Sequence, residues 1–451
     1  MVIKQFEDKN LAHFSYAIID KGEIALIDPS RDPKQYYDLA KKEGSVITTI
    51  IETHPHADFI SSHLEIHKKT GATIYVSKLA AAEYPHQTFD DGEAIILGDI
   101  VLKSLNTPGH SPDSISIVVI NSEGIEIAVF TGDTLFIGDC GRPDLREKAG
   151  AITATRAELA KQMFHTLRNK LMTLPNDVLV YPAHGAGSLC GKGLSDQKTS
   201  TIGVEKSDNW SLKNISEDDF IKELLADQPF IPKYFTYDVE LNKKGANSFE
   251  ESINNIPKRE PVTCQNCAKS LDHNIIVVDT RPQLSYKKSH LKNAINIPND
   301  TKFETWLGSI IGPDEKFYLL AENDEVLTEL TNRIAKIGYE SNIELAFISD
   351  YGDSSMPVFD AEQLKNQEDA FTIVDIRNPS EVTIQKIFTN SINIPLYQLR
   401  ERAEEIPLNK PIVVHCAGGY RSAAGSSILK YKLNGNATIF DLSEAVKQFQ
   451  K

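Results

Sequence analysis

The stretch IETHPHADFISSH, residues 51–63, decides how the first half of the chain is interpreted. His54, His56 and Asp58 keep the spacing of a His-x-His-x-Asp-His metal-binding motif, but Phe59 stands where the last histidine is expected. Metal ions in proteins are held by imidazole, carboxylate and thiolate groups, and a phenyl ring offers none of these. The motif therefore predicts a metal site that has lost one of its ligands.

Short β-rich runs that end in polar loops surround this motif. EIALIDPS (23–30), SVITTIIETH (45–54) and DVLVYPAHG (177–185) are interpreted as strands, and residues 32–44 and 59–71 as helices closed by glycine. Histidine and aspartate side chains stand where the strands stop. Loops at that edge converge in α/β proteins, so these side chains are expected to meet.

Three of these loops carry the predicted metal ligands. His54, His110 in NTPGHS and Asp133 in FTGDT each follow a β-rich run. Two imidazoles and one carboxylate leave positions open on the ion, a set that suits non-haem Fe(II). A single loop histidine is more often structural or solvated, but the same pattern in three separate loops predicts one shared metal site.

The motifs THPHADF, TPGHSPDS, FTGDTLF and YPAHGAG, in this order, resemble the metallo-β-lactamase fold, an αββα sandwich. TGDTLFIGDCGRPDL resembles its persulfide dioxygenase branch. The resemblance implies one Fe(II) per chain on the three ligands. It also implies that the other polar residues of these motifs orient the ligands or the substrate: His56, Asp58 and His184. It implies oxidation of a low-molecular-weight thiol persulfide by O2 to sulfite. In the two-zinc hydrolases of this fold, a histidine at the position of Phe59 helps to hold a second ion.

Residues further along the same motifs are candidates for contact with substrate. Arg142 and Asp144 in GDCGRPDL are expected at the substrate mouth, or in a mutual salt bridge. Cys190 lies six residues after His184 and is expected either to carry a persulfide at the iron pocket or to be a loop thiol without a role. Cys140 is expected to pack near the pocket.

The second half of the chain contains a repeat. Residues 274–298 match residues 371–395, and each copy begins with a strand that ends in Asp-x-Arg and closes with Asn-x-Ile-Asn-Ile-Pro or a close variant. We therefore predict two α/β domains there. The expected organisation is a metal-binding domain with a closing segment (1–240), a linker (241–265), an inactive rhodanese-like domain (266–352) and an active rhodanese domain (353–451).

VVHCAGGYRSAAGSSIL, starting at residue 413, predicts a nucleophilic cysteine. A strand delivers Cys416 into a loop that runs into a helix, where backbone N–H groups and Arg421 favour the thiolate. The loop, with Cys416 and Arg421 as catalytic groups, resembles the active loop of rhodanese sulfurtransferases. The resemblance implies that the intervening residues cradle a cysteine persulfide: Ala417, Gly418, Gly419 and Tyr420.

The first repeat lacks this nucleophile. Ala321, Glu322 and Asn323 occupy the corresponding loop, and the acidic side chain there would repel a persulfide anion. The whole chain thus resembles bacterial fusions of a persulfide dioxygenase, a pseudo-rhodanese and a rhodanese. Cys264 and Cys267 form a CxxC pair that is half of a zinc site, with weak support for a redox role.

Composition narrows the partners. A net charge of −15 argues against nucleic acid, and no apolar run is long enough for a membrane helix. Five cysteines in 451 residues and no apolar leader indicate a reducing cytoplasm. The expected substrates are O2, sulfite or thiosulfate, and a persulfide of glutathione, coenzyme A or bacillithiol; a homo-oligomer is expected from the resemblance.

Two other functions remain open at this stage. The chain could be a zinc thioester hydrolase similar to glyoxalase II, fused to a sulfur carrier, although Phe59 disfavours that function. It could also be a sulfur relay without enzymatic activity, in which Cys416 only passes a persulfide to a partner. The direction of sulfur transfer between thiosulfate and the thiol is not determined by these residues.

Overall fold

The computed structural model describes residues 1–145 and 154–450. The chain forms two compact units, Met1–Ser252 with Ala335–Gly338, and Ile253–Ile334 with Tyr339–Lys451. None of the helices in the described residues is both long enough and apolar enough to span a membrane.

The first unit is built on two six-stranded sheets. In one sheet, the four strands between residues 23 and 88 run parallel and the two strands before them are antiparallel. In the other, the described strands pair antiparallel except for Glu126–Gly132 with Leu179–Pro182. The first sheet is ordered β1 (Val2–Asp8), β2 (His13–Asp20), β3 (Glu23–Ile27), β4 (Val46–Ile51), β5 (Thr73–Val76) and β6 (Gln87–Thr88). The second is ordered β12 (Ser200–Thr201), β11 (Leu179–Pro182), β10 (Glu126–Gly132), β9 (Ile115–Ile120), β8 (Ile100–Asn106) and β7 (Ala94–Leu97).

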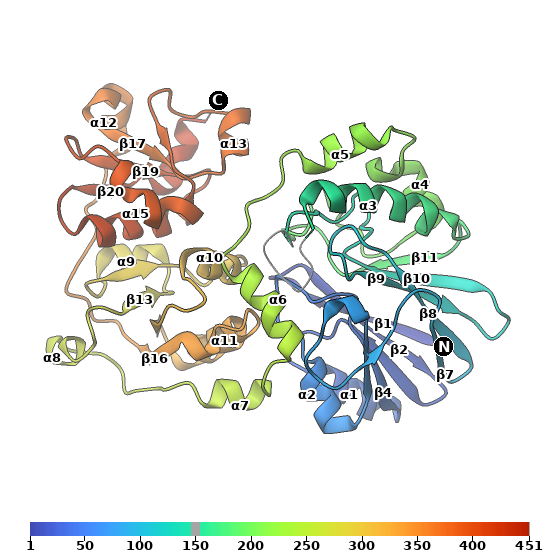
Figure 1. Ribbon diagram of the computed structural model, residues 1–451. Coiled ribbons are helices and arrows are strands. Elements are labelled where there is room, and N and C mark those ends of the chain that lie inside the picture. Colours follow the sequence, from blue (N-terminus) through green and yellow to red (C-terminus); the bar gives the residue numbers. More distant parts are fainter. Residues whose placement is uncertain (146–153, 451) are drawn as a thin grey trace. The chain divides into compact units, whose positions relative to one another are not determined.

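Apolar side chains from both sheets meet between them. Tyr16 and Ile18 of β2 belong to the same buried cluster as Ile117 of β9 and Phe130 of β10. Helices cover the two outer faces: α1 (Lys34–Glu43) and α2 (His63–Thr70) on the first sheet, α3 (Arg156–Asn169) and α5 (Glu217–Leu225) on the second (Figure 1). These layers are the αββα sandwich that the sequence predicted.

One local expectation needs correction. The helix predicted over 59–71 begins only at His63, because Asn242 binds the preceding loop: its Nδ2 donates to the carbonyls of His56 and Phe59, and its Oδ1 accepts from the N–H of Ser61. The closing segment and the linker expected over 241–265 contain helices α6 (Tyr234–Lys244) and α7 (Phe249–Asn254).

The second unit contains two four-stranded parallel sheets. The first is ordered β14 (Ala294–Asn296), β13 (Ile276–Asp279), β15 (Phe317–Ala321) and β16 (Ile343–Ile348), and the second β18 (Ile392–Asn393), β17 (Thr372–Asp375), β19 (Ile412–His415) and β20 (Ile439–Asp441). The helices of the first repeat are α8 (Gln265–Lys269), α9 (Gln283–Lys288), α10 (Phe303–Ile310) and α11 (Asp324–Ala335); those of the second are α12 (Ala361–Asn366), α13 (Pro379–Ile384), α14 (Leu399–Arg402) and α15 (Tyr420–Leu433).

The repeated Asp-x-Arg pattern has the same structural task in both copies. Arg377 Nη2 donates to Asp375 at 2.6 Å and to the carbonyl of Gln385 at 2.8 Å, and the corresponding arginine of the first repeat does the same to its own aspartate and loop. Asn393 Nδ2 donates to the carbonyls of Asp375 and Arg377. The pattern therefore ties the end of each central strand to the returning strand, which explains its spacing.

Candidate metal centre and sulfur-transfer site

The structure brings the three predicted metal ligands together. His54 follows β4, His110 follows β8, and Asp133 follows β10, and all three are buried. Asp133 Oδ2 lies 3.8 Å from His54 Nε2 and 3.6 Å from His110 Nε2. One ligand atom from each residue lies within 4.8 Å of the other two, a spacing at which one ion can bridge all three.

Hydrogen bonds orient both histidines for this role. His110 Nδ1 lies 2.8 Å from the carbonyl oxygen of Arg142, which can only accept, so Nδ1 carries the proton. Thr53 Oγ1 donates to Asp28 Oδ2 at 2.8 Å, so it must accept from His54 Nδ1 at 3.0 Å. With protons on Nδ1, the Nε2 atoms that face Asp133 are the metal-binding nitrogens.

The carboxylate of Asp133 divides its two oxygens between different tasks. Oδ1 lies 2.7 Å from His184 Nδ1, while Oδ2 is buried and has no hydrogen-bond partner. A buried carboxylate oxygen without a partner is costly unless a cation satisfies it. This oxygen, together with the two histidine nitrogens, makes the residues fit a transition-metal ion.

The electrostatics of the site agree with this arrangement. Burial alone would raise the pKa of Asp133, but His184, His110 and His54 hold it well below its usual range. Burial would lower the pKa of His184, yet Asp133 and Asp58 raise it well above the ordinary histidine value. The pocket thus keeps its carboxylate ionised and concentrates negative charge where a cation would bind.

Phe59 fills the position next to the metal-binding residues with apolar surface. Its buried ring lies 3.8 Å, centroid to centroid, from the ring of His13 and 4.4 Å from that of His56. In a two-zinc hydrolase, Asp58 and His184 would help to hold the second ion. Here His184 Nε2 lies 2.8 Å from Asp58 Oδ2, so the two side chains interact with each other.

Cys190 lies at the same place. Ligand atoms of Asp58, His184 and Cys190 are within 4.8 Å of one another, and the thiol also contacts Asp133. Burial, Asp58 and Asp133 raise the pKa of Cys190 well above its usual value. The sulfur therefore lies in the metal pocket as a neutral thiol.

Arg142 and Asp144 bind each other. The guanidinium of Arg142 makes two 2.7 Å hydrogen bonds to the carboxylate of Asp144 and a third to the carbonyl of Leu189. The backbone of Arg142 meanwhile accepts from His110 and donates to the carbonyl of Cys190. This pair links the loops around the metal-binding residues, and Cys140 packs in the hydrophobic cluster under α3.

Two residues that support the site escaped the sequence analysis. Asp28 accepts from the N–H and the hydroxyl of Thr53, and its Oδ1 lies 3.2 Å from His56 Nε2. An aspartate at the end of β3 was a signal that could have been followed. Asn242 offered no such signal, because it is distant in sequence and lies within a helix.

The predicted nucleophile lies in the expected loop. β19 ends at His415, and Cys416 begins a tight turn in which the N–H of Gly419 donates to Cys416 Sγ at 3.1 Å. Gly419 adopts φ = +107°, and a Cβ there would lie 3.0 Å from the backbone nitrogen of Glu444. The turn therefore requires glycine, and it directs a backbone donor at the sulfur.

Arg421 follows the turn on the first part of α15. Its guanidinium makes two hydrogen bonds to Glu381, of 2.6 and 2.7 Å. Burial works against both charges, but the hydrogen bond from Arg421 lowers the pKa of Glu381. Glu381 thus holds the arginine in place beside the cysteine loop.

A cavity of about 470 Å³ opens beside this loop. Gly418 and Tyr420 line it from the active loop, and three carboxylates line it from elsewhere: Asp300, Glu322 and Glu444. None of the described residues that line it is a lysine or an arginine. By strand register Ala321 stands at the position of Cys416. Glu322, the next residue, adds negative charge to the surroundings of the active loop.

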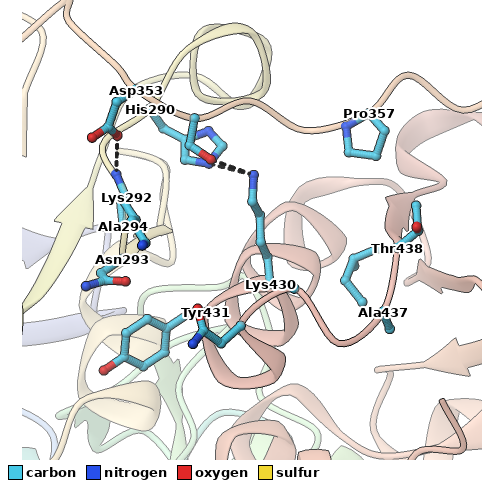
Figure 2. Close-up of a pocket in the computed structure, with 14 residues that line it drawn as sticks. His290, Lys292, Asn293, Ala294, Asp353, Pro357, Lys430, Tyr431, Ala437 and Thr438 are labelled. Carbon is cyan, nitrogen blue, oxygen red and sulfur yellow. Dashed lines mark hydrogen bonds between the residues drawn. The ribbon is translucent and has the colours of Figure 1, made fainter.

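A second cavity of about 300 Å³ lies at the opposite ends of the strands (Figure 2). It is bounded by the beginning of β14, the beginning of β20 and the C-terminal end of α15, away from Cys416. Lys430 lies in its wall, 3.2 Å from His290 Nε2, and donates to Ser354 Oγ at 2.9 Å. Because these interactions already engage the lysine, the cavity near Gly418 is the better candidate for sulfur transfer.

The first unit is an αββα sandwich with buried histidines and a carboxylate at its loop edge, and two parallel α/β repeats with one cysteine loop follow it. These features define a metal-binding protein with rhodanese-like domains. The chain belongs to the metallo-β-lactamase superfamily, whose family model matches residues 9–184. The rhodanese-like domain model matches residues 265–345 and 360–451.

The chain is similar to several known proteins. A crystal structure of a metallo-β-lactamase from Staphylococcus aureus subsp. aureus COL is 34% identical, with a TM-score of 0.69, covering 77% of this chain and 99% of that one. Persulfide dioxygenase ETHE1, mitochondrial, of Homo sapiens is 29% identical over 44% of this chain and 74% of its own length. Cytoplasmic hydroxyacylglutathione hydrolase of Arabidopsis thaliana is 33% identical over 38% and 63%. The predicted likeness to a fusion of persulfide dioxygenase and rhodanese is confirmed.

Proposed function

We propose that this protein is an Fe(II)-dependent persulfide dioxygenase that also transfers sulfane sulfur. The observation that carries the proposal is the buried set of His54, His110 and Asp133 with Phe59 beside it. Two imidazoles and one carboxylate on one ion are the donor set of non-haem Fe(II) oxygenases. Phe59 removes a donor that a two-zinc hydrolase would need.

The first reaction converts R–S–SH, O2 and water into R–SH and sulfite with two protons. Bound Fe(II) would supply open coordination positions and the redox activity that dioxygen chemistry needs, while the outer sulfur of the persulfide gives the four electrons that reduce O2 as it becomes sulfite. The chain supplies the environment: Thr53 and the carbonyl of Arg142 keep both histidines in the metal-binding tautomer, and Asp133 provides negative charge. Phe59 and His13 shield one side of the pocket from water with their closely packed, mutually tilted rings.

The second reaction belongs to Cys416. Its thiolate takes the outer sulfur of a persulfide, releasing the thiol, and sulfite then removes that sulfur as thiosulfate. The N–H of Gly419 stabilises negative charge on the sulfur, and Arg421 adds positive charge nearby. The reverse direction uses the same residues, so thiosulfate can also serve as the sulfur donor.

Cys190 takes no transfer step in this proposal. Its raised pKa keeps it a neutral thiol at physiological pH, and a neutral thiol is a poor nucleophile. Together with Asp58 and His184 it shapes the pocket wall beside the metal-binding residues.

Oxygen uptake by iron-loaded protein tests the proposal. Persulfides of glutathione, coenzyme A and bacillithiol are supplied in turn, and sulfite and thiosulfate are assayed together. We expect uptake with thiosulfate as the product, and a shift to sulfite in Cys416→Ser but not in the matched control Cys140→Ser, whose sulfur is buried in a hydrophobic cluster.

Three results would contradict the proposal. Uptake that persists in His54→Ala would remove the metal site from the reaction. Thioester hydrolysis by zinc-loaded protein, without oxygen uptake in the iron form, would favour the hydrolase. Persulfide on Cys416 with no uptake by iron-loaded protein and any carrier thiol would favour a sulfur relay.

A further inference from the structure

Cys264 and Cys267 form a dithiol that the proposed function does not use. Cys264 is exposed and Cys267 partly exposed, whereas Cys140, Cys190 and Cys416 are buried. An exposed sulfur atom can meet a dissolved sulfur compound without any movement of the protein around it. By this criterion the pair is better placed than the other three cysteines to meet such a compound directly.

The local geometry assigns different tasks to the two thiols. Cys264 precedes α8 and accepts the backbone N–H of Cys267 at an N···S distance of 3.2 Å. Hydrogen bonds from the thiol and then from the backbone of Cys267 lower the pKa of Cys264. Burial has the opposite effect on Cys140 and Cys190, whose pKa values are raised. The exposed sulfur is therefore also one that is biased towards the thiolate, with a second thiol beside it.

The dithiol stands at the loop edge of the inactive repeat. The segment before it runs parallel to β16: Lys258 bridges to Ala346, and the N–H of Val262 donates to the carbonyl of Ile348 at 2.9 Å. Ser349 Oγ, just beyond β16, donates to the carbonyl of Val262 at 2.6 Å. Because the segment is parallel to the sheet, its end lies where the strands of this repeat end.

That edge is where α/β domains place their reactive groups. In the second repeat the same edge carries Cys416, after β19. In the first repeat Glu322 follows the corresponding strand β15, so the nucleophile is absent from that loop. The CxxC pair places two thiols at this edge, directly after the segment that pairs with β16.

We propose that Cys264 and Cys267 form a second sulfur-accepting site, which takes the sulfane sulfur of a low-molecular-weight thiol persulfide and releases it as hydrogen sulfide. The site lies in the repeat that lacks the rhodanese nucleophile. It acts separately from the metal centre and from Cys416, and it rests on the proposed function only in that both use the same class of substrate.

The chemistry balances in two displacement steps. The Cys264 thiolate attacks the outer sulfur of R–S–SH, the S–S bond of the persulfide breaks, and R–SH leaves, so that Cys264 carries –S–SH. The Cys267 thiolate then attacks the inner sulfur, a disulfide forms between the two cysteines, and hydrogen sulfide leaves. The sulfane sulfur is reduced to sulfide and two thiols are oxidised to one disulfide. Two further R–SH molecules restore the dithiol and leave as R–S–S–R.

The test uses the full chain with Cys416→Ser and with iron removed by a chelator, so that neither site of the proposed function consumes persulfide. Glutathione persulfide is added without oxygen, and sulfide release and the masses of the cysteine peptides are measured. We expect about one sulfide per chain and a Cys264–Cys267 disulfide. Adding Cys267→Ser should stop the reaction at a Cys264 persulfide, about 32 Da heavier, with no sulfide released.

The controls separate this site from other thiols. Adding Cys264→Ser should abolish both the mass change and the sulfide, while Cys140→Ser should leave them as in the parent. Sulfide release that is unchanged in Cys264→Ser, or two unmodified thiols after treatment of the parent, would overturn the inference. Neither result bears on oxygen uptake by the iron-loaded wild-type protein, which tests the proposed function separately.

Discussion

Asp28→Asn is the sharpest test of how the metal-binding residues are held. Asp28 is not a ligand, but its carboxylate accepts from both the N–H and the hydroxyl of Thr53, at 2.7 and 2.8 Å. The hydroxyl is thereby left to accept from His54 Nδ1. Asparagine keeps the size and offers one acceptor and one donor. If its N–H2 group faces the hydroxyl, Thr53 must donate to His54, and the proton moves to Nε2, where it blocks the metal.

The expected loss can be worked from these contacts. One hydrogen bond to a charged group is lost, at about 1.5–3 kcal/mol, which corresponds to roughly 10- to 100-fold in metal affinity if the whole loss falls on the ligand position. Competition with a coloured chelator measures the Fe(II) affinity of Asp28→Asn against wild type. Thr53→Ser is the matched control, since it keeps the hydroxyl and should lose less than about threefold. An Asp28→Asn protein that binds iron with wild-type affinity would refute the reasoning.

Three further predictions concern other parts of the chain. Gly141→Ala should reduce the bound iron measured after purification, because the added Cβ would lie 1.9 Å from the backbone carbonyl oxygen of Asp133. The control Gly193→Ala should load iron normally, because the nearest atom to its Cβ is 3.6 Å away. Burial is the main reason why the pKa of His290 is lowered to about 4. As the pH falls, the histidine is therefore protonated in the unfolded chain before it is protonated in the folded one. Its contribution to stability is present above pH 6.5 and is lost between pH 6.5 and 4. By pH 5 about 2 kcal/mol of this contribution is lost. Urea unfolding at pH 7 and pH 5 should therefore show a smaller loss of stability in His290→Gln than in wild type, and an equal loss would contradict the prediction. Glu322→Lys changes the charge beside the active loop by two. For the thiosulfate dianion at about 10 Å in water this is worth about 1.7 kcal/mol, so sulfur transfer from thiosulfate should rise about 15-fold at low salt, and high salt should abolish the gain.

The candidate metal ligands show how much of a site local sequence pattern can predict. His54, His110 and Asp133 could be named before the fold was known, because each ends a β-rich run and ligand chemistry restricts the residue types. The position of Cys416 was predictable for a similar reason, since a tight turn between an apolar strand and a helix leaves a recognisable run of small residues.

The support for these groups came from residues distant in the chain. Asn242 is 183 residues from Phe59 in sequence, yet its amide donates to the carbonyls of His56 and Phe59. These hydrogen bonds fix the loop before α2 in a non-helical conformation. The pairing of Glu381 with Arg421 likewise joins the start of α13 to the start of α15, 40 residues away. A hydrogen bond between such partners depends on the packing of whole elements, and no local pattern encodes it.

The sequence by itself determined the fold class and named the candidate ligands and the candidate nucleophile, because strand and helix periodicity and ligand chemistry act over a few neighbouring residues. Only the tertiary structure decided the tautomers of His54 and His110, the neutral state of Cys190 and the mutual pairing of Arg142 with Asp144. Those properties depend on burial and on charges brought within a few ångströms by distant segments. Such distances exist only once the two sheets have packed.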